Sequence, residues 1–179
     1  MRLFTAIDIS PEVKATLATL LDRLRPLAKL GWIPVEKLHI TTKFIGEWPE
    51  ERLDELKRAL AAVVSPVVEV AIRGVGWLPN PRSARTLYAG VEASDALTAL
   101  ADVTERAAAG VGVLAEDRIF RPHLTLARTR KRVPLGALKH ALAEIEHSAI
   151  GSYRASSFVL YLSTGGKYTK LQEFQLTNS

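Results

Sequence analysis

The chain contains no cysteine. This absence excludes disulfide bonds, zinc–thiolate centres, iron–sulfur clusters and a cysteine nucleophile, and it is typical of proteins from a reducing compartment. No apolar run approaches the roughly 18–20 residues that a membrane-spanning helix needs. The first residues, MRLFTAIDIS, lack the layout of a secretory signal peptide. We therefore expect a cytoplasmic protein that does not associate with membranes.

The composition is that of an ordinary globular protein, with 47% hydrophobic and 24% charged residues among 179. This length suffices for one sizeable domain or for two small lobes that share a core. No low-complexity segment or long linker divides the chain, so we expect residues 1–179 to form a single bilobal domain. No pattern indicates a subunit interface, and we expect a monomer.

The formal net charge of +5 favours anionic partners such as nucleic acids or nucleotides. The densest group of basic residues comprises Arg128, Arg130, Lys131 and Arg132. Such a run can contact a nucleic acid, and it can equally be a solvated loop. Both interpretations stay open.

Strands and helices are mixed along the chain. Apolar and β-branched segments between turn residues predict strands at 2–9, 38–45, 67–78, 84–91, 118–127, 153–163 and 168–176. Apolar residues at helical spacing predict helices that begin near Pro11, Pro49, Ser94 and Leu135. Because several strands are joined by short turns, we expect an α+β fold with mainly antiparallel sheets flanked by helices.

Two short segments of the chain resemble each other and lie about half its length apart. They read His39-Ile40-Thr41 and His123-Leu124-Thr125, each on a predicted strand. Successive side chains of a strand alternate in direction, so the histidine and the threonine of each motif share one face, about 6–7 Å apart. The intervening apolar residue points into a core. The repeat therefore predicts two imidazoles and two hydroxyls that face one cleft.

These groups suit in-line displacement at phosphorus. A neutral histidine can take a proton from the attacking water, while a protonated one gives a proton to the leaving oxygen. The threonine hydroxyls can donate hydrogen bonds to the phosphate and stabilise the transition state. We therefore expect a phosphoesterase that needs no metal ion and no other cofactor.

A lone histidine on a strand is more often structural, so this interpretation depends on the second copy of the motif. The remaining histidines, His140 and His147, lie outside any such motif, and we expect them on the surface. No metal-binding pattern such as HExxH is present.

The chain resembles the two-histidine (2H) phosphoesterases, and within them the RNA 2′,3′-cyclic phosphodiesterases, historically named 2′-5′ RNA ligases. The similarity extends over nearly the whole chain. It rests on segments that follow the family's order, namely RLFTAIDIS, GWIPVEKLHITTKFIGE, GVGWLPNPRSARTLYAGV, IFRPHLTLAR and YLSTGGKYTKLQEFQL. The resemblance implies two pseudo-symmetric α+β lobes around a positively charged cleft. The implied substrates are RNA with 2′,3′-cyclic phosphate ends and cyclic nucleotides.

The resemblance also implies catalytic roles for His39, Thr41, His123 and Thr125. His39 is then the general acid that protonates the departing 3′ oxygen, and His123 is the base that activates water. The product is a 2′-phosphomonoester. The family name further implies that RNA ends can be joined through 2′-5′ linkages in the reverse direction. Thr42 stands where the family usually has an aliphatic residue, and because it is expected to face the core, the difference concerns local packing.

Two basic residues are candidates for substrate binding because of strand alternation. Arg121 is expected on the face of His123, and Lys43 on the face of His39. Either could contact phosphate. A salt bridge at the rim is the alternative for Arg121, and simple solvation is the alternative for Lys43.

Three further candidates are less constrained by alternation. Arg128 matches the family's arginine after the second motif, but it is out of phase with His123 unless the strand ends or bulges there. Phe44 could stack on a nucleobase, although its expected face favours the core. Tyr168 could border the cleft or only pack.

Two other functions remain open. The chain could be a nucleotide- or RNA-binding module without turnover, which the four intact motif residues disfavour. It could also hydrolyse a different cyclic phosphate, such as ADP-ribose 1″,2″-cyclic phosphate.

Overall fold

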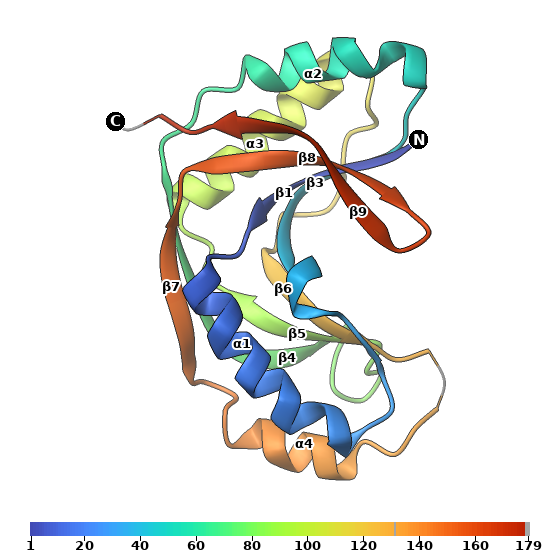
Figure 1. The fold of residues 1–179 in the computed structure, drawn as a ribbon, viewed down its shortest axis with the longest axis vertical. Helices are drawn as coiled ribbons and strands as arrows, with labels where there is room; N and C mark the ends of the chain where they lie inside the picture. Colours follow the sequence, from blue (N-terminus) through green and yellow to red (C-terminus); the bar gives the residue numbers. More distant parts are fainter. Residues whose placement is uncertain (131, 178–179) are drawn as a thin grey trace.

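The computed structural model describes residues 1–130 and 132–177 (Figure 1). Its strands are β1 (Arg2–Asp8), β2 (Gly31–Trp32), β3 (His39–Glu47), β4 (Val68–Leu78), β5 (Thr86–Val91), β6 (His123–Arg128), β7 (Ala149–Ala155), β8 (Ser157–Thr164) and β9 (Lys167–Gln175). Its α-helices are α1 (Pro11–Leu24), α2 (Leu53–Ala61), α3 (Asp95–Gly110) and α4 (Gly136–Ala143). None of the helices in these two ranges is long and apolar enough to cross a membrane.

The strands form one antiparallel sheet in the order β7-β4-β5-β6-β3-β1-β8-β9, with the short β2 added to β6. The central neighbours β6 and β3 divide this sheet into two halves. Helices α1 and α4 lie with the half that contains β4 to β7, and α2 and α3 lie with the half that contains β1, β3, β8 and β9 (Figure 1). The expected α+β fold with mainly antiparallel pairing is thus confirmed.

The helix starts follow from the sequence. Ser10 accepts a hydrogen bond from the backbone N–H of Val13 at 3.3 Å and caps α1, whose first residue is Pro11. Ser94 caps α3 in the same way through the N–H of Leu97, at 3.2 Å. These caps satisfy backbone donors that have no partner inside the helix.

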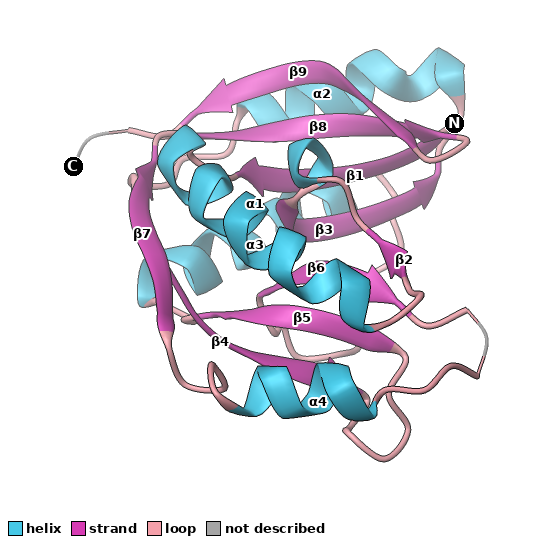
Figure 2. Cartoon of the chain, turned by 60° about the horizontal axis from the view of Figure 1, so that its bottom comes forward, coloured by secondary structure: helices cyan, strands magenta, loops and turns pink. Residues whose placement is uncertain are grey.

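Two strand expectations need correction. The strand expected at 153–163 is divided, because residues up to Ala155 pair with β4 in one half, whereas β8 pairs with β1 in the other. Figure 2 shows β7 running along one side of the molecule to the level of β8. The strand expected at 118–127 begins only at His123, since its neighbour β5 ends at Val91 and offers no partner to earlier residues.

A single large cluster of buried apolar residues joins the two halves. It contains Ile40 from β3 and Leu124 from β6, which are both fully buried, together with Leu17 of α1 and Leu100 of α3. A second, small buried cluster consists of Phe4, Ala6, Val159 and Tyr161. The pairing registers of β1 with β3 and β8 place this second cluster on the same face as His39.

Both strands that carry a His-x-Thr motif contain a β-bulge directly after the threonine. In β3, Thr41 pairs with Ala6 and Lys43 pairs with Thr5, which leaves Thr42 as the extra residue. In β6, Leu126 is the extra residue in the same way. A bulge lets two residues oppose one on the partner strand, so the later side chains change faces.

Thr42 is buried, and its hydroxyl lies 2.7 Å from the hydroxyl of Thr5 on β1. This hydrogen bond explains how a polar residue is tolerated where the resembled family usually has an aliphatic one. Each hydroxyl satisfies the other inside the core.

We predict that Thr42→Val lowers the free energy of unfolding by about 1–3 kcal/mol, because it leaves the buried Thr5 hydroxyl without a partner. The double variant Thr5→Val/Thr42→Val removes both hydroxyls and is expected to lose less than the sum of the two single variants. Urea denaturation of the four proteins measures this difference. Additive losses would show that the two hydroxyls are not energetically coupled.

Candidate active site

The two His-x-Thr motifs meet where β3 pairs with β6. Ile40 is the residue that pairs with Leu124, and both side chains are buried in the core. The flanking residues of each motif therefore point to the opposite face. Because the strands are antiparallel, this register places His39 opposite Thr125, and Thr41 opposite His123. All four side chains are half-buried.

Each catalytic candidate histidine is held by the same backbone contact. The Nδ1 of His39 lies 2.8 Å from the carbonyl oxygen of Lys37, and the Nδ1 of His123 lies 2.9 Å from that of Arg121. A carbonyl oxygen can only accept, so Nδ1 carries the hydrogen in both rings. Within the described residues no hydrogen bond engages either Nε2. Both Nε2 atoms can therefore take or give a proton.

Aromatic rings surround His39. Its ring centroid lies 4.8 Å from that of Phe4 and 5.2 Å from that of Tyr168, which meets it edge-on. Burial among these groups lowers the pKa of His39, and the carbonyl of Lys37 opposes this shift. The charges of Arg128 and of His123 lower the pKa further. These two residues of β6 are thus electrostatically coupled to the histidine of β3.

Asp8 was not expected at the site from the sequence. It pairs with His39 in the register of β1 and β3, and its negative charge raises the pKa of that histidine. Its carboxylate accepts hydrogen bonds from the hydroxyl of Tyr161 and the ammonium of Lys170, each at 2.5 Å. Alternation along 2–9 could have grouped Phe4, Ala6 and Asp8 on one face, but not the register that brings them to His39.

The surroundings of His123 are more open. It pairs with Gly90 of β5, and the ring of Tyr88 lies edge-on to it at 6.0 Å. Tyr88 pairs with Thr125 and was also not expected at the site. One half of the site is therefore enclosed by aromatic rings, and the other is flanked by one tyrosine and a glycine.

Strand β6 contains the bulge that Arg128 needs in order to share the face of His123. The bulge at Leu126 leaves two successive residues buried, after which Arg128 is exposed. Its charge also reaches His39. The bulge therefore moves Arg128 out of the simple alternation that separated it from His123.

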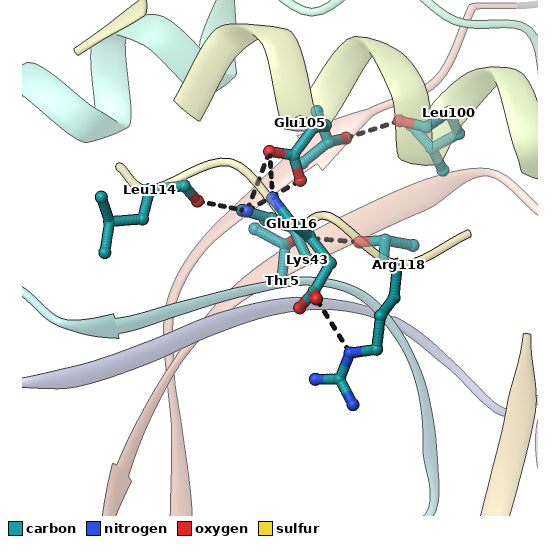
Figure 3. A network of polar contacts seen from close by, with 9 residues as sticks. Thr5, Lys43, Leu100, Glu105, Leu114, Glu116 and Arg118 are labelled. Atoms are coloured by element: carbon teal, nitrogen blue, oxygen red, sulfur yellow. Dashed lines mark hydrogen bonds and ion pairs between the residues drawn. The ribbon is translucent and has the colours of Figure 1, made fainter. Parts of the chain in front are cut away.

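The expectation that Lys43 shares the face of His39 is wrong. The bulge at Thr42 turns Lys43 to the other side of the sheet, where it is buried with 4% of its surface exposed. Its ammonium lies 2.7 Å from the Glu105 carboxylate of α3 and donates to the carbonyl of Leu114 at 2.9 Å (Figure 3). Glu105 also accepts from the backbone N–H of Glu116 at 3.2 Å. Lys43 therefore holds the loop between α3 and β6 against β3 and α3.

The expectation that Phe44 faces the core is also wrong. The same bulge exposes 62% of its surface and places its ring 6.5 Å from that of Phe4, on the side of His39. Tyr168 borders the site as well, with 37% of its surface exposed. Both rings are available to a ligand.

The remaining candidates lie around the site. Arg121 is exposed and precedes β6, so strand alternation does not direct its side chain, while its carbonyl holds His123. Arg130 and Arg132 are exposed after β6, and Lys131 lies outside the described residues. His140 and His147 are exposed, as expected. Among the residues described, no three histidine or acidic side chains form a cluster suited to a metal ion.

The chain was compared with known families, curated proteins and solved structures. The family model "LigT like Phosphoesterase" matches residues 7–88 and 90–168. An RNA 2′,3′-cyclic phosphodiesterase of Thermus thermophilus is 34% identical over 194 residues, covering 98% of this chain and 90% of the relative. One of Archaeoglobus fulgidus is 32% identical over 134 residues, covering 75% and 76%.

Solved structures agree over the whole length. A crystal structure of a Thermus thermophilus protein superposes with a TM-score of 0.82 at 28% identity and covers 99% of both chains. Escherichia coli LigT in its apo form gives a TM-score of 0.78 at 25% identity and covers 99% of this chain and 98% of its own. The chain belongs to the LigT-like phosphoesterase family of the two-histidine superfamily.

Proposed function

We propose that this chain hydrolyses the 2′,3′-cyclic phosphate ends of RNA, and cyclic nucleotides, to 2′-phosphomonoesters. The observation that carries the proposal is the antiparallel meeting of the two His-x-Thr motifs, with both histidines anchored through Nδ1 and, within the described chain, unengaged at Nε2. The relatives named RNA 2′,3′-cyclic phosphodiesterase support the same substrate.

In the proposed reaction His123 acts as base and His39 as acid. Nε2 of His123 takes a proton from water as the water oxygen bonds to phosphorus. The bond from phosphorus to the 3′ oxygen breaks, and protonated His39 gives its proton to that oxygen. The 2′ oxygen keeps the phosphate. Solvent then removes the proton from His123 and restores the one on His39.

The hydroxyls of Thr41 and Thr125 are placed to donate to the non-bridging oxygens, and the positive charge of Arg128 compensates the negative charge that develops there. No cofactor enters these steps. A 5′-hydroxyl of another RNA that replaces water as the nucleophile would yield a 2′-5′ linkage, so ligation belongs to the same proposal.

The flanking residues complete the proposed site. The exposed rings of Phe44 and Tyr168 are suited to stack on a nucleobase. Arg121, which is exposed two residues before His123, is the proposed additional contact to phosphate. We further propose that residues 1–179 act as one bilobal domain and as a monomer in the cytoplasm. Lys43 has no part in substrate binding, because its ammonium is engaged in the core.

We predict that His39→Ala and His123→Ala each lower kcat for 2′,3′-cyclic AMP and for an RNA with a 2′,3′-cyclic end by about 10²–10⁴-fold. The double variant is expected to lose little more, because the two histidines act as a unit. Chromatographic separation of 2′- and 3′-phosphates measures rate and regiochemistry together. His140→Ala, at an exposed histidine outside the site, is the matched control, and full activity in either site variant would overturn the paired mechanism.

Treatment with EDTA tests the independence from metal ions. We predict unchanged kcat and KM after chelation and dialysis, since the proposed acid and base are both side chains of this chain. The same assay is repeated with ADP-ribose 1″,2″-cyclic phosphate, because the sequence leaves this compound open as an alternative substrate. Loss of activity that returns with a divalent cation would contradict the expectation.

The pH profile tests which histidine donates the proton. Burial lowers the pKa of His39 below 6.5, so the free enzyme loses the proton of this acid as the pH rises through that lowered value. We predict that kcat/KM falls on the alkaline side of its pH profile with an apparent pKa below 6.5. The alkaline fall of kcat is expected at higher pH, because the bound anionic phosphate favours the imidazolium form of His39. The residual activity of His39→Ala should lack this alkaline fall. If the alkaline fall disappears in His123→Ala and persists in His39→Ala, then His123 is the acid and His39 the base.

A further inference from the structure

Two long stretches of the chain contain basic residues and no acidic ones. No aspartate or glutamate lies between Glu69 and Glu92, or between Asp117 and Glu144. The basic residues in these stretches are Arg73, Arg82, Arg85, Arg118, Arg121, Arg128, Arg130, Lys131, Arg132 and Lys139. Apart from residues in the loop before β6, both stretches belong to the half of the sheet that carries His123.

Three of these cations lie on neighbouring backbone segments at one end of the strands of that half. Arg82 and Arg85 lie in the loop between β4 and β5, and Arg130 follows β6. We call these three residues the basic edge. Figures 1 and 2 both place the loop between β4 and β5 and the segment after β6 at the same end of this half, and Figure 2 shows strand β2 at that end as well.

Hydrogen bonds hold the segments of the basic edge together. The backbone N–H of Thr129 donates to the carbonyl of Arg85 at 2.8 Å, and the hydroxyl of Thr129 donates to that of Ala84 at 3.0 Å. From α4, Lys139 donates to the carbonyl of Pro81 at 3.0 Å. The arginines therefore project from segments that are fixed to one another.

Gly31 of β2 completes this packing. A Cβ atom added to Gly31 would lie only 3.3 Å from Nε of Arg130, which shows that the side chain of Arg130 packs against β2 at this glycine. Gly31 also pairs with Arg128, which links the basic edge directly to the strand of the second motif. The exposed arginines thus extend from the segment after β6 to Arg128, the last residue of the strand that carries His123.

The charges of the basic edge are not neutralised within the described chain. Other cations of the two acid-free stretches have acidic partners, as Arg73 has Glu92 and Arg118 has Glu116. Arg82, Arg85 and Arg130 are exposed and form no ion pair with any residue that the structure describes. Exposed arginines without acidic partners, on backbone segments that are hydrogen-bonded to one another, are suited to bind phosphate groups.

On the basis of the proposed function, we propose that the basic edge binds the phosphodiester backbone of single-stranded RNA on the 5′ side of the cyclic end. The site then receives the terminal phosphate, and the edge holds the nucleotides before it. The enzyme therefore prefers RNA ends over cyclic mononucleotides. The reaction that supplies its substrate is an RNA cleavage that leaves 2′,3′-cyclic phosphates on chains of several nucleotides.

Binding is measured separately from turnover with a 5′-labelled single-stranded RNA that ends in a 2′-phosphate, by fluorescence anisotropy at increasing KCl. We predict that Arg82→Ala/Arg130→Ala raises Kd on the order of tenfold and lowers the slope of log Kd against log salt by about 1.4. Hydrolysis of 2′,3′-cyclic AMP by this variant should be unchanged.

The matched control is Arg58→Ala/Arg106→Ala, which removes two exposed arginines from α2 and α3 and changes the net charge equally. It is expected to bind the RNA as the unchanged protein does. Equal Kd values for Arg82→Ala/Arg130→Ala and the unchanged protein, or equal weakening by both double variants, would falsify the basic edge. RNA binding at the edge without any hydrolysis of cyclic phosphates would instead contradict the proposed function alone.

Discussion

The antiparallel contact between β3 and β6 determines the geometry of the site. Neighbouring strands lie about 4.8 Å apart, so groups on the two strands can reach a single phosphate. The contact is anchored by Ile40 and Leu124, which alternate with the polar residues of the motifs and are fully buried. The same alternation that places the histidines on one face thus builds the core on the other. A change that separates the two strands would disturb both histidines and the core together.

The equivalent bulges in β3 and β6 give the two halves different chemistry from the same backbone. In each strand two successive residues after the threonine are buried, and the next is exposed. That exposed residue is Phe44 in one half and Arg128 in the other. The half with Phe44 encloses His39 in aromatic rings and lowers its pKa by burial. The half with Arg128 carries the basic edge.

The sequence predicts most of the helices, the strand content and the paired motifs, because these depend on local periodicity, caps and turns. It does not predict where a strand bulges, since a bulge depends on the register with a neighbour distant in the chain. For this reason, simple alternation predicts Lys43 on the face of His39 and Phe44 in the core, whereas the structure shows the reverse. The same limit conceals Asp8, whose position beside His39 follows from the pairing of β1 with β3. It also hides the division of 153–163, where two successive strands pair in different halves.

The two unlike halves are suited to different parts of an RNA end. A terminal nucleotide carries one base, one cyclic phosphate and a chain that continues from its 5′ oxygen. On the proposed arrangement, the rings of Phe44 and Tyr168 can receive the base while the arginines beyond β6 hold the chain. A cyclic mononucleotide then uses the rings and the histidines but not the basic edge. On this proposal, selection of substrate by length requires no further pocket, because the strand that positions His123 also leads to the arginines proposed to bind the RNA chain.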